Sequence, residues 1–216
     1  MSLTGAHHAF AGVSEDGVNK IAHAFFGARP RYLHYGTTPF VGTTTITETQ
    51  VSTIAFPGIP GGISYMVELS IPQFDLYPPN GPLPPPLVLG PNQLSVKTEA
   101  HITLGCLQTG AGSEKRGTTT PVSTDLEVWA IGHPVSQTFS LGVGDIYFHV
   151  DDVKVMPVAP ASLDLVLDCL LRMILNGVLS SLQLPFKIFN VDFFKLILEE
   201  GPLVTANQIE IRGGIV

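Results

Sequence analysis

The longest apolar stretch of the chain runs from Ser162 to Gln183, and polar residues recur along it at every fourth position. These polar residues form one narrow stripe: Asp164, Asp168, Arg172 and Asn176. Ser162 suits a helix N-cap, Asp164 meets the positive end of the helix dipole, and Pro185 ends the segment. The pattern therefore predicts a long helix that is apolar around most of its girth, and such a helix has to be enclosed by other elements.

A second helix is predicted near the N-terminus. Ser14 provides a capping hydroxyl, and Glu15 and Asp16 place two carboxylates in the first turn. Apolar residues then share one face or lie beside it: Val18, Ile21, Ala22, Phe25 and Phe26. We expect this helix to pack its apolar face against the core, because its polar face carries too few Lys and Arg residues for a membrane-surface helix.

Much of the remaining chain alternates between apolar and polar positions, as extended strands do. The clearest case is Asn92–Gln108, in which one face is apolar: Leu94, Val96, Ala100, Ile102, Leu104 and Cys106. Further strands are predicted over Ile63–Tyr77 with a break at Pro72, over Val122–Ile131, over Val135–Val155 and over Gln208–Arg212. The outward-facing Trp129 marks either an exposed aromatic residue or a contact.

Three segments carry weaker patterns. Residues 1–13 favour a flexible or packed lead-in, and Val41–Phe56 is rich in Thr, Val and Ile, which favours extended structure. Pro78–Pro91 is proline-rich. For this segment a rigid loop, with Leu87–Leu89 folded back on the body, is favoured over a polyproline ligand for an adaptor domain.

Together these elements predict an α+β fold in which sheet wraps a long apolar helix, with a second helix near the N-terminus. No internal repeat and no break in composition divides residues 1–216, which predicts one domain. A jelly-roll sandwich is the chief rival fold, although a long apolar helix fits it poorly.

Composition narrows the classes of function. Only 13% of the residues are charged and the net charge is −7, which disfavours binding to nucleic acid or docking on anionic lipid. The long helix carries charges that a membrane span excludes, so the apolar side chains belong in a core, a ligand cavity or an interface. Cys106 and Cys169 are interpreted as buried thiols, with one strand-to-helix disulfide as the alternative in a secreted protein.

The first residues show no basic n-region and no sustained apolar h-region, so no signal peptide is predicted. We expect a cytoplasmic protein from the sequence as it stands. Secretion by a leaderless route, or after removal of a leader, is the alternative.

Motifs of catalysis are missing from the sequence, which contains no GxSxG, P-loop, GxGxxG, CxxC or HExxH. The densest group of reactive side chains is Asp145, His149, Asp151 and Asp152. Solvated charges at a strand end explain this group more simply than metal binding or acid–base chemistry. We therefore expect a protein that is not an enzyme and has no cofactor and no bound metal.

The order of the parts resembles one module of the TULIP superfamily, the tubular lipid-binding proteins that include the bactericidal/permeability-increasing protein. The resemblance rests on the helix start at Ser14–Asp16, the segment RPRYLHYG, the proline-rich turn and the helix exit through LQLPFKIFNVDF at Leu184-Pro185. It implies one TULIP-like domain over residues 1–216, in which a long, strongly curved antiparallel sheet wraps the long C-terminal helix and lipid fills the tube between them. Without a basic tip for lipopolysaccharide, the chain is more similar to the leaderless bacterial type found in some toxin gene clusters.

Two functions are therefore expected. The first is binding of a lipid, a fatty-acid-like molecule or another elongated apolar ligand, with membrane contact at most transient. The expected lining residues come from both helices and the best strand: Phe25, Leu94, Val96, Ile102, Leu104, Val166, Leu170, Met173 and Ile174. The second is a structural or interaction protein with a filled core, either a homo-oligomer or a subunit of a complex, with contacts through Trp129 and Leu87–Leu89. An unfilled apolar cavity favours the first function, and an exposed apolar patch favours the second.

Overall fold

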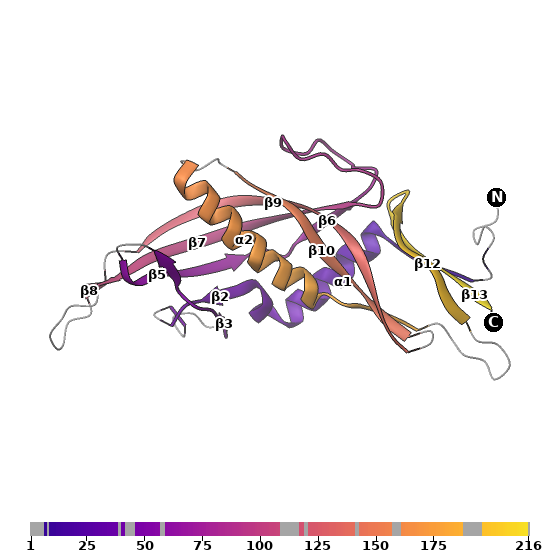
Figure 1. Ribbon diagram of the computed structural model, residues 1–216, viewed down its shortest axis with the longest axis horizontal. Helices are drawn as coiled ribbons and strands as arrows, with labels where there is room; N and C mark the ends of the chain where they lie inside the picture. The colour runs from indigo at the N-terminus through magenta and orange to yellow at the C-terminus, as the bar shows by residue number, and fades with distance from the viewer. Residues whose placement is uncertain are drawn as a thin grey trace. The chain divides into compact units, whose positions relative to one another are not determined.

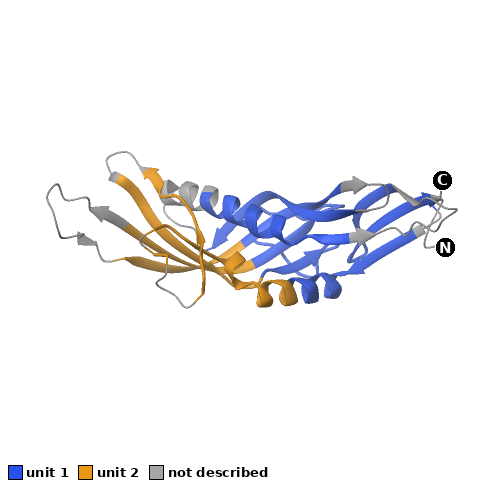
Figure 2. Ribbon diagram, turned by 90° about the horizontal axis from the view of Figure 1, so that it is seen from below, with its two compact units in different colours: residues 1–22, 72–97, 129–216 blue, residues 23–71, 98–128 orange. Residues whose placement is uncertain are grey.

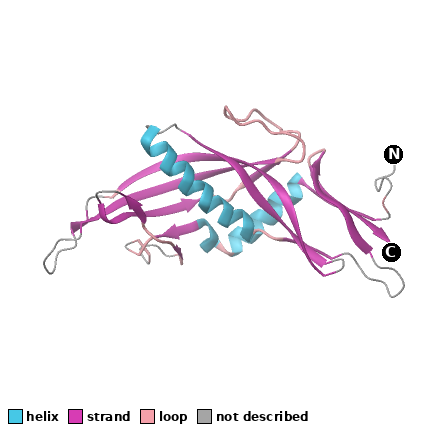
Figure 3. Cartoon of the chain, in the orientation of Figure 1, coloured by secondary structure: helices cyan, strands magenta, loops and turns pink. Residues whose placement is uncertain are grey.

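The computed structural model describes residues 7, 9–38, 40–41, 46–56, 59–108, 117–118, 121–140, 143–156, 161–187 and 196–215. Within these ranges the protein is α+β and mostly strand, with a strongly curled, largely antiparallel sheet and two α-helices (Figures 1 and 3). Two compact units, coloured separately in Figure 2, divide the chain. Unit 1 contains residues 1–22, 72–97 and 129–216, and unit 2 contains residues 23–71 and 98–128.

Unit 1 contains a small antiparallel sheet with the strand order β1-β13-β12. Its strands are β1 (Ala9–Ser14), β13 (Gln208–Ile215) and β12 (Leu196–Thr205). The turn between β12 and β13 contains Ala206 and Asn207, both with positive φ. The Asn207 carbonyl accepts a hydrogen bond of 2.9 Å from the Glu15 amide, which fixes this turn against the first residue of helix α1 (Glu15–Ala28).

The larger sheet of unit 1 has the neighbouring strands β11-β10-β9-β7, with β6 paired to β7. These strands are β11 (Leu184–Lys187), β10 (Val143–Met156), β9 (Val122–Ser140), β7 (Leu94–Gln108) and β6 (Gln73–Leu76); β7 and β9 also contribute residues to unit 2. The long helix α2 (Ala161–Ser181) packs along β10. The side-chain oxygen of Asn176 on α2 accepts a hydrogen bond of 3.1 Å from the Val150 backbone amide on β10.

Helix α1 begins as the sequence predicts, because the Ser14 hydroxyl accepts a hydrogen bond of 3.2 Å from the Gly17 amide. The Asn19 side chain then holds β6 at two points. Its amide nitrogen donates to the Phe74 carbonyl and its oxygen accepts from the Phe74 amide, both at 2.8 Å. This pair of bonds fixes the first half of α1 against the sheet of unit 1.

Unit 2 continues the antiparallel pairing with the neighbours β9-β7-β5-β2, and β3 pairs with β2 in parallel. Its further elements are a 3-10 helix at Pro30–Leu33, β2 (His34–Gly36), β3 (Thr49–Gln50), β4 (Ile54–Phe56), β5 (Ile59–Leu69) and β8 (Gly117–Thr118). A fully buried Thr37 accepts a hydrogen bond from the Tyr65 amide at 3.1 Å and donates one to the Tyr65 carbonyl at 3.2 Å.

Both predicted helices are confirmed, as are the strand at 94–108 and the break at Pro72. For residues 1–13 the sequence favours a flexible or packed lead-in, and the structure adds that Ala9–Ser14 forms β1 by pairing with β13. In the segment 41–56 only short strands occur within the described residues, at β3 and β4. The expectations of one domain, and of a sheet wrapped around the long helix, stay predictions. The side chains of Cys106 and Cys169 lie outside the described residues.

The proline-rich loop folds back on unit 1, as expected. Leu87 and Leu89 are buried together with Ile131 of β9, and Trp129 packs against this cluster. The Lys97 ammonium group lies 5.0 Å from the centre of the Trp129 ring. The contact that Trp129 marks is therefore one within the chain.

A candidate apolar ligand site

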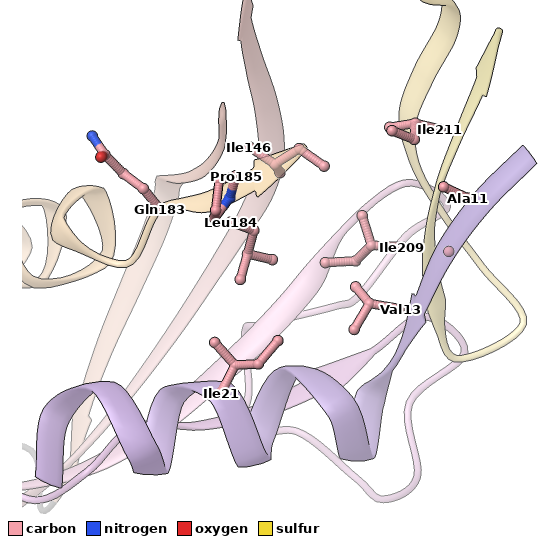
Figure 4. A pocket seen from close by; sticks show the side chains of 10 residues that line it. Ala11, Val13, Ile21, Ile146, Gln183, Leu184, Pro185, Ile209 and Ile211 are labelled. Atoms are coloured by element: carbon pink, nitrogen blue, oxygen red, sulfur yellow. The ribbon is translucent and has the colours of Figure 1, made fainter. Parts of the chain in front are cut away.

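Unit 1 contains an apolar pocket with a volume of about 400 Å³ (Figure 4). Five segments line it: β1 and α1, which are consecutive in the chain, and β10, the α2–β11 junction and β13, which come much later. The lining residues are Ala11, Gly12, Val13, Ile21, Ile146, Gln183, Leu184, Pro185, Ile209 and Ile211. Gln183 carries the one polar side chain in this set.

The small sheet forms one wall of the pocket. Val13 of β1 and Ile209 of β13 are directly paired across the two strands, and both point into the pocket. Ile209 and Ile211 lie on the same face of β13, because side chains two residues apart in a strand share a face. The intervening Glu210 therefore points to the opposite face of the sheet.

A network of charges holds that opposite face. Glu210 accepts hydrogen bonds from Thr205 at 2.7 Å and Gln208 at 2.5 Å, and Arg212 contacts both Glu210 and Glu200 at 3.0 Å. Burial alone would raise the pKa of Glu210, but these hydrogen bonds and the charge of Arg212 outweigh it and lower the pKa below its ordinary value. The ionised network thus stabilises the strand that presents Ile209 and Ile211.

The β10–β11 pair forms a second wall. Ile146 of β10 and Leu184 of β11 are cross-strand partners, and both side chains are buried. Helix α2 ends at Ser181, and the backbone N–H of Gln183 donates to the Ser181 carbonyl at 3.1 Å. The chain then enters β11 at the next residue, Leu184. Because α2 packs along β10, this short junction fixes β11 at the pocket.

Helix α1 forms the remaining side with a single residue. Val18, Ala22 and Phe26 are fully buried, whereas Ile21 is 40% exposed. Figure 4 shows the Ile21 side chain rising from α1 toward Leu184, with Val13 and Ile209 beyond it. An isoleucine left in contact with solvent inside an apolar pocket leaves free energy to be gained by a ligand that covers it.

The lining residues that the structure describes include no ionisable side chain. Gln183 is exposed, and in Figure 4 its amide points away from the isoleucine and valine side chains. The nearest cation on α1, Lys20, is ion-paired with Asp16 at 2.6 Å. Chemically, the pocket offers apolar surface in its interior and uncharged hydrogen-bonding groups at its edge.

None of the lining residues expected from the sequence belongs to this pocket. Leu94, Val96, Leu170 and Ile174 of unit 1 and Ile102 of unit 2 are buried, and Leu104 and Phe25 of unit 2 are half-buried. Met173 is 57% exposed, and the Val166 side chain lies outside the described residues. Their role as ligand contacts stays a prediction.

Sequence reasoning missed the residues that do line the pocket. One usable signal existed, since the alternation of Ile209, Glu210, Ile211 and Arg212 marks an apolar face on the closing strand. No local signal identified Ala11, Gly12 or Val13, because their segment is short and contains small residues.

Of the group Asp145, His149, Asp151 and Asp152, two members lie beside a histidine from outside it, and Asp152 is ion-paired with Arg172 at 3.0 Å. His133 lies 2.9 Å from both carboxylate oxygens of Asp151, and its ring centre is 5.4 Å from that of His149. Asp145 is paired in register with Pro185. In the part of the chain that is described, no cluster of three or more His, Cys, Asp or Glu side chains is placed to hold a metal ion.

Neither of the described helices combines the length and apolar character that crossing a bilayer requires. The chain matches no family model and no curated protein. Among solved structures, it is similar to the crystal structure of a lipopolysaccharide binding protein, with 12% sequence identity and a TM-score of 0.32. The match covers 96% of this chain and 40% of that chain. At this level the likeness carries no weight for function, which has to be inferred from the pocket itself.

Proposed function

We propose that this protein binds a lipid or another elongated apolar ligand in the pocket of unit 1. The observation that carries the proposal is the lining, which is apolar apart from Gln183 and leaves Ile21 40% exposed. Soluble proteins place such concave apolar surfaces at ligand sites. The proposed role is binding and not catalysis, because the lining supplies no acid, base or nucleophile.

The volume fits one aliphatic chain. An apolar cavity of about 150 Å³ accommodates benzene, which has six carbon atoms. The same ratio applied to the pocket volume of about 400 Å³ gives on the order of 16 carbon atoms. The pocket thus has room for a single acyl or alkyl chain of medium to long length.

The energetics support binding of such a chain. Each buried CH₂ group contributes about 0.8 kcal/mol, so ~16 carbons contribute ~13 kcal/mol. Loss of translational and rotational freedom costs about 4 kcal/mol or more. The remaining ~9 kcal/mol corresponds to a dissociation constant of about 0.2 μM, whereas a chain of ten carbons retains only ~4 kcal/mol and binds near 1 mM.

Native mass spectrometry of the purified protein, followed by solvent extraction and lipid identification, tests the proposal. We expect an adduct of one lipid per chain, either carried through purification or formed after incubation with long-chain alcohols, fatty acids and phospholipids. A bare mass that stays unchanged after all three incubations would overturn the proposal.

A tube between the sheet and helix α2, as in the TULIP superfamily, is the finer form of this proposal. It predicts that Leu170 and Ile174 of α2 also contact the bound chain. Photo-crosslinking with a diazirine-bearing lipid tests it, because labelled peptides from α2 support a tube and labels restricted to β1, β11 and β13 argue for the pocket alone.

A second candidate is an interaction protein that acts as a homo-oligomer or as a subunit. Val88 favours it, because this side chain is 78% exposed on a loop that Leu87 and Leu89 anchor. The same native spectrum decides between the two. A dimeric mass without any lipid adduct, shifted to the monomer by Val88→Asp, supports the second candidate.

A further inference from the structure

We infer that the ligand of this pocket has an uncharged, hydrogen-bonding polar end, such as an alcohol, ester or amide, and that this end lies at the mouth beside Gln183. The inference rests on the proposed function and adds the class of ligand to it. Its basis is that the polar groups at the pocket are uncharged: backbone N–H and C=O groups and the side-chain amide of Gln183.

Two terminal strands contribute residues to the lining. Ala11, Gly12 and Val13 are consecutive, and consecutive residues of a strand point to opposite faces. Ala11 and Val13 share one face of the small sheet with their partners Ile211 and Ile209, and Gly12 lines the pocket through its backbone because it has no side chain. Among the described strands β1 is terminal in the small sheet, so backbone N–H and C=O groups along its outer edge border this wall of the pocket.

The junction at Gln183, Leu184 and Pro185 repeats the arrangement. These residues are also consecutive, and β11 is a terminal strand of its sheet. Pro185 has no N–H, so its backbone offers only a carbonyl acceptor. The backbone groups of the two terminal strands and the side-chain amide of Gln183 therefore give the pocket uncharged hydrogen-bond donors and acceptors.

Among the described residues, the segments that form the pocket bring no cation into the lining. β1 contains no charged residue, Lys20 of α1 is ion-paired with Asp16, and Arg212 of β13 is ion-paired on the opposite face. On β10, Asp145 is paired in register with the lining residue Pro185, so the charge described beside Pro185 is a carboxylate. The Lys187 side chain lies outside the described residues.

A carboxylate or phosphate at the mouth would thus lose part of its hydration without gaining a cationic partner. Burial of a charge without a partner is far more costly than burial of a hydroxyl that forms hydrogen bonds. An anionic lipid would have to withdraw its head into water, and its chain would then fill less of the pocket. Between molecules of equal chain length, the neutral one should bind more tightly.

Displacement of Nile red, an uncharged dye, by 1-dodecanol and by dodecanoate at pH 8 tests this inference. At this pH the fatty acid is ionised, since an ordinary carboxyl pKa is about 4.3. We expect the alcohol to bind about tenfold more tightly or better. Equal affinity, or tighter binding of dodecanoate, would overturn the inference and leave the proposed function standing. If neither compound displaces the dye and native mass spectrometry shows no lipid adduct, the proposed function itself fails.

A charge introduced at the mouth gives a second test. Gln183→Arg should increase the affinity for dodecanoate about tenfold and change the affinity for dodecanol little, because a guanidinium supplies the missing partner. Gln73→Arg is the matched control, since Gln73 is exposed on β6 and does not line the pocket. An unchanged affinity for dodecanoate in Gln183→Arg would place the polar end elsewhere and overturn the inference.

Discussion

Glu210 and Arg212 occupy alternate positions of β13, and their side chains form an ion pair of 3.0 Å on the face opposite to Ile209 and Ile211. The strand is therefore divided between two roles. One face lines the apolar pocket, and the other is held by a network in which Glu210 is only 6% exposed. Disturbance of the network should alter the stability of the pocket wall without placing any new group inside the pocket.

Replacement of the buried carboxylate should destabilise the protein in a pH-dependent way. We expect Glu210→Gln to lower the free energy of unfolding at pH 7 by about 1–3 kcal/mol, because it leaves hydrogen-bonding partners poorly satisfied. The folded pKa of Glu210 is depressed, so its contribution is present above the unfolded pKa of about 4.3 and is lost as the pH falls through the folded value.

Urea denaturation of the wild type and of Glu210→Gln between pH 7 and pH 3 measures this effect. The difference between the two proteins should shrink below about pH 4.3. Glu99→Gln, at an exposed position of β7, serves as the control and should change stability by less than about 0.5 kcal/mol. A difference for Glu210→Gln that is constant with pH would contradict the assignment.

Filling the pocket from α1 should weaken ligand binding and leave the fold intact. Ile21→Trp places a bulky ring where the present side chain is 40% exposed, so the stability change should stay within about 1 kcal/mol. We expect the affinity for a C12 or C16 alcohol to fall about tenfold or more, which calorimetry can measure. Val122→Trp, at a position that is 69% exposed and outside the pocket, should bind as the wild type does. Wild-type affinity in Ile21→Trp would exclude this pocket as the site.

Affinity should increase with ligand length until the pocket is full. Each added CH₂ contributes about 0.8 kcal/mol, which is about a fourfold decrease in the dissociation constant. For primary alcohols from C8 upward, we expect this increment to disappear near 16 carbons, the length estimated from the pocket volume. A series in which affinity keeps rising well beyond that length would indicate a longer tube and favour the finer, TULIP-like proposal.

Strands β9 and β10 of unit 1 approach so closely at Gly132 that any side chain there should lower the stability of the protein. A Cβ atom added at Gly132 of β9 would collide with the backbone carbonyl oxygen of His149 on β10. We expect Gly132→Ala to lower the free energy of unfolding by about 1–3 kcal/mol, since backbone atoms cannot move aside as a side chain can. Gly27→Ala is the matched control. A Cβ atom there meets nothing within 4 Å, and alanine in a helix should stabilise by about 0.5–1 kcal/mol. Chemical denaturation of both variants compares them, and a neutral Gly132→Ala would contradict the packing of β9 on β10.

The sequence by itself determined the elements whose signals are local. The cap of α1 could be predicted because the Ser14 hydroxyl and the amide that it accepts from are only three residues apart. The apolar stretch after Ser162 could be assigned to α2 because helical periodicity is also a property of neighbouring residues. The strand β7 followed from strict alternation over its own length. Charge and composition likewise narrowed the expected function to apolar binding or interaction.

Only the tertiary structure decided where the pocket lies. Ala9–Ser14 has no strong strand signal and becomes β1 because β13 supplies the hydrogen-bonding partners. A helical pattern places Ile21 on an apolar face, but neighbouring segments decide that Val18 is covered and Ile21 is left 40% exposed. Periodicity is a property of one segment, whereas a pocket depends on the distances between five of them. The lining residues could therefore be read only after the chain had been folded.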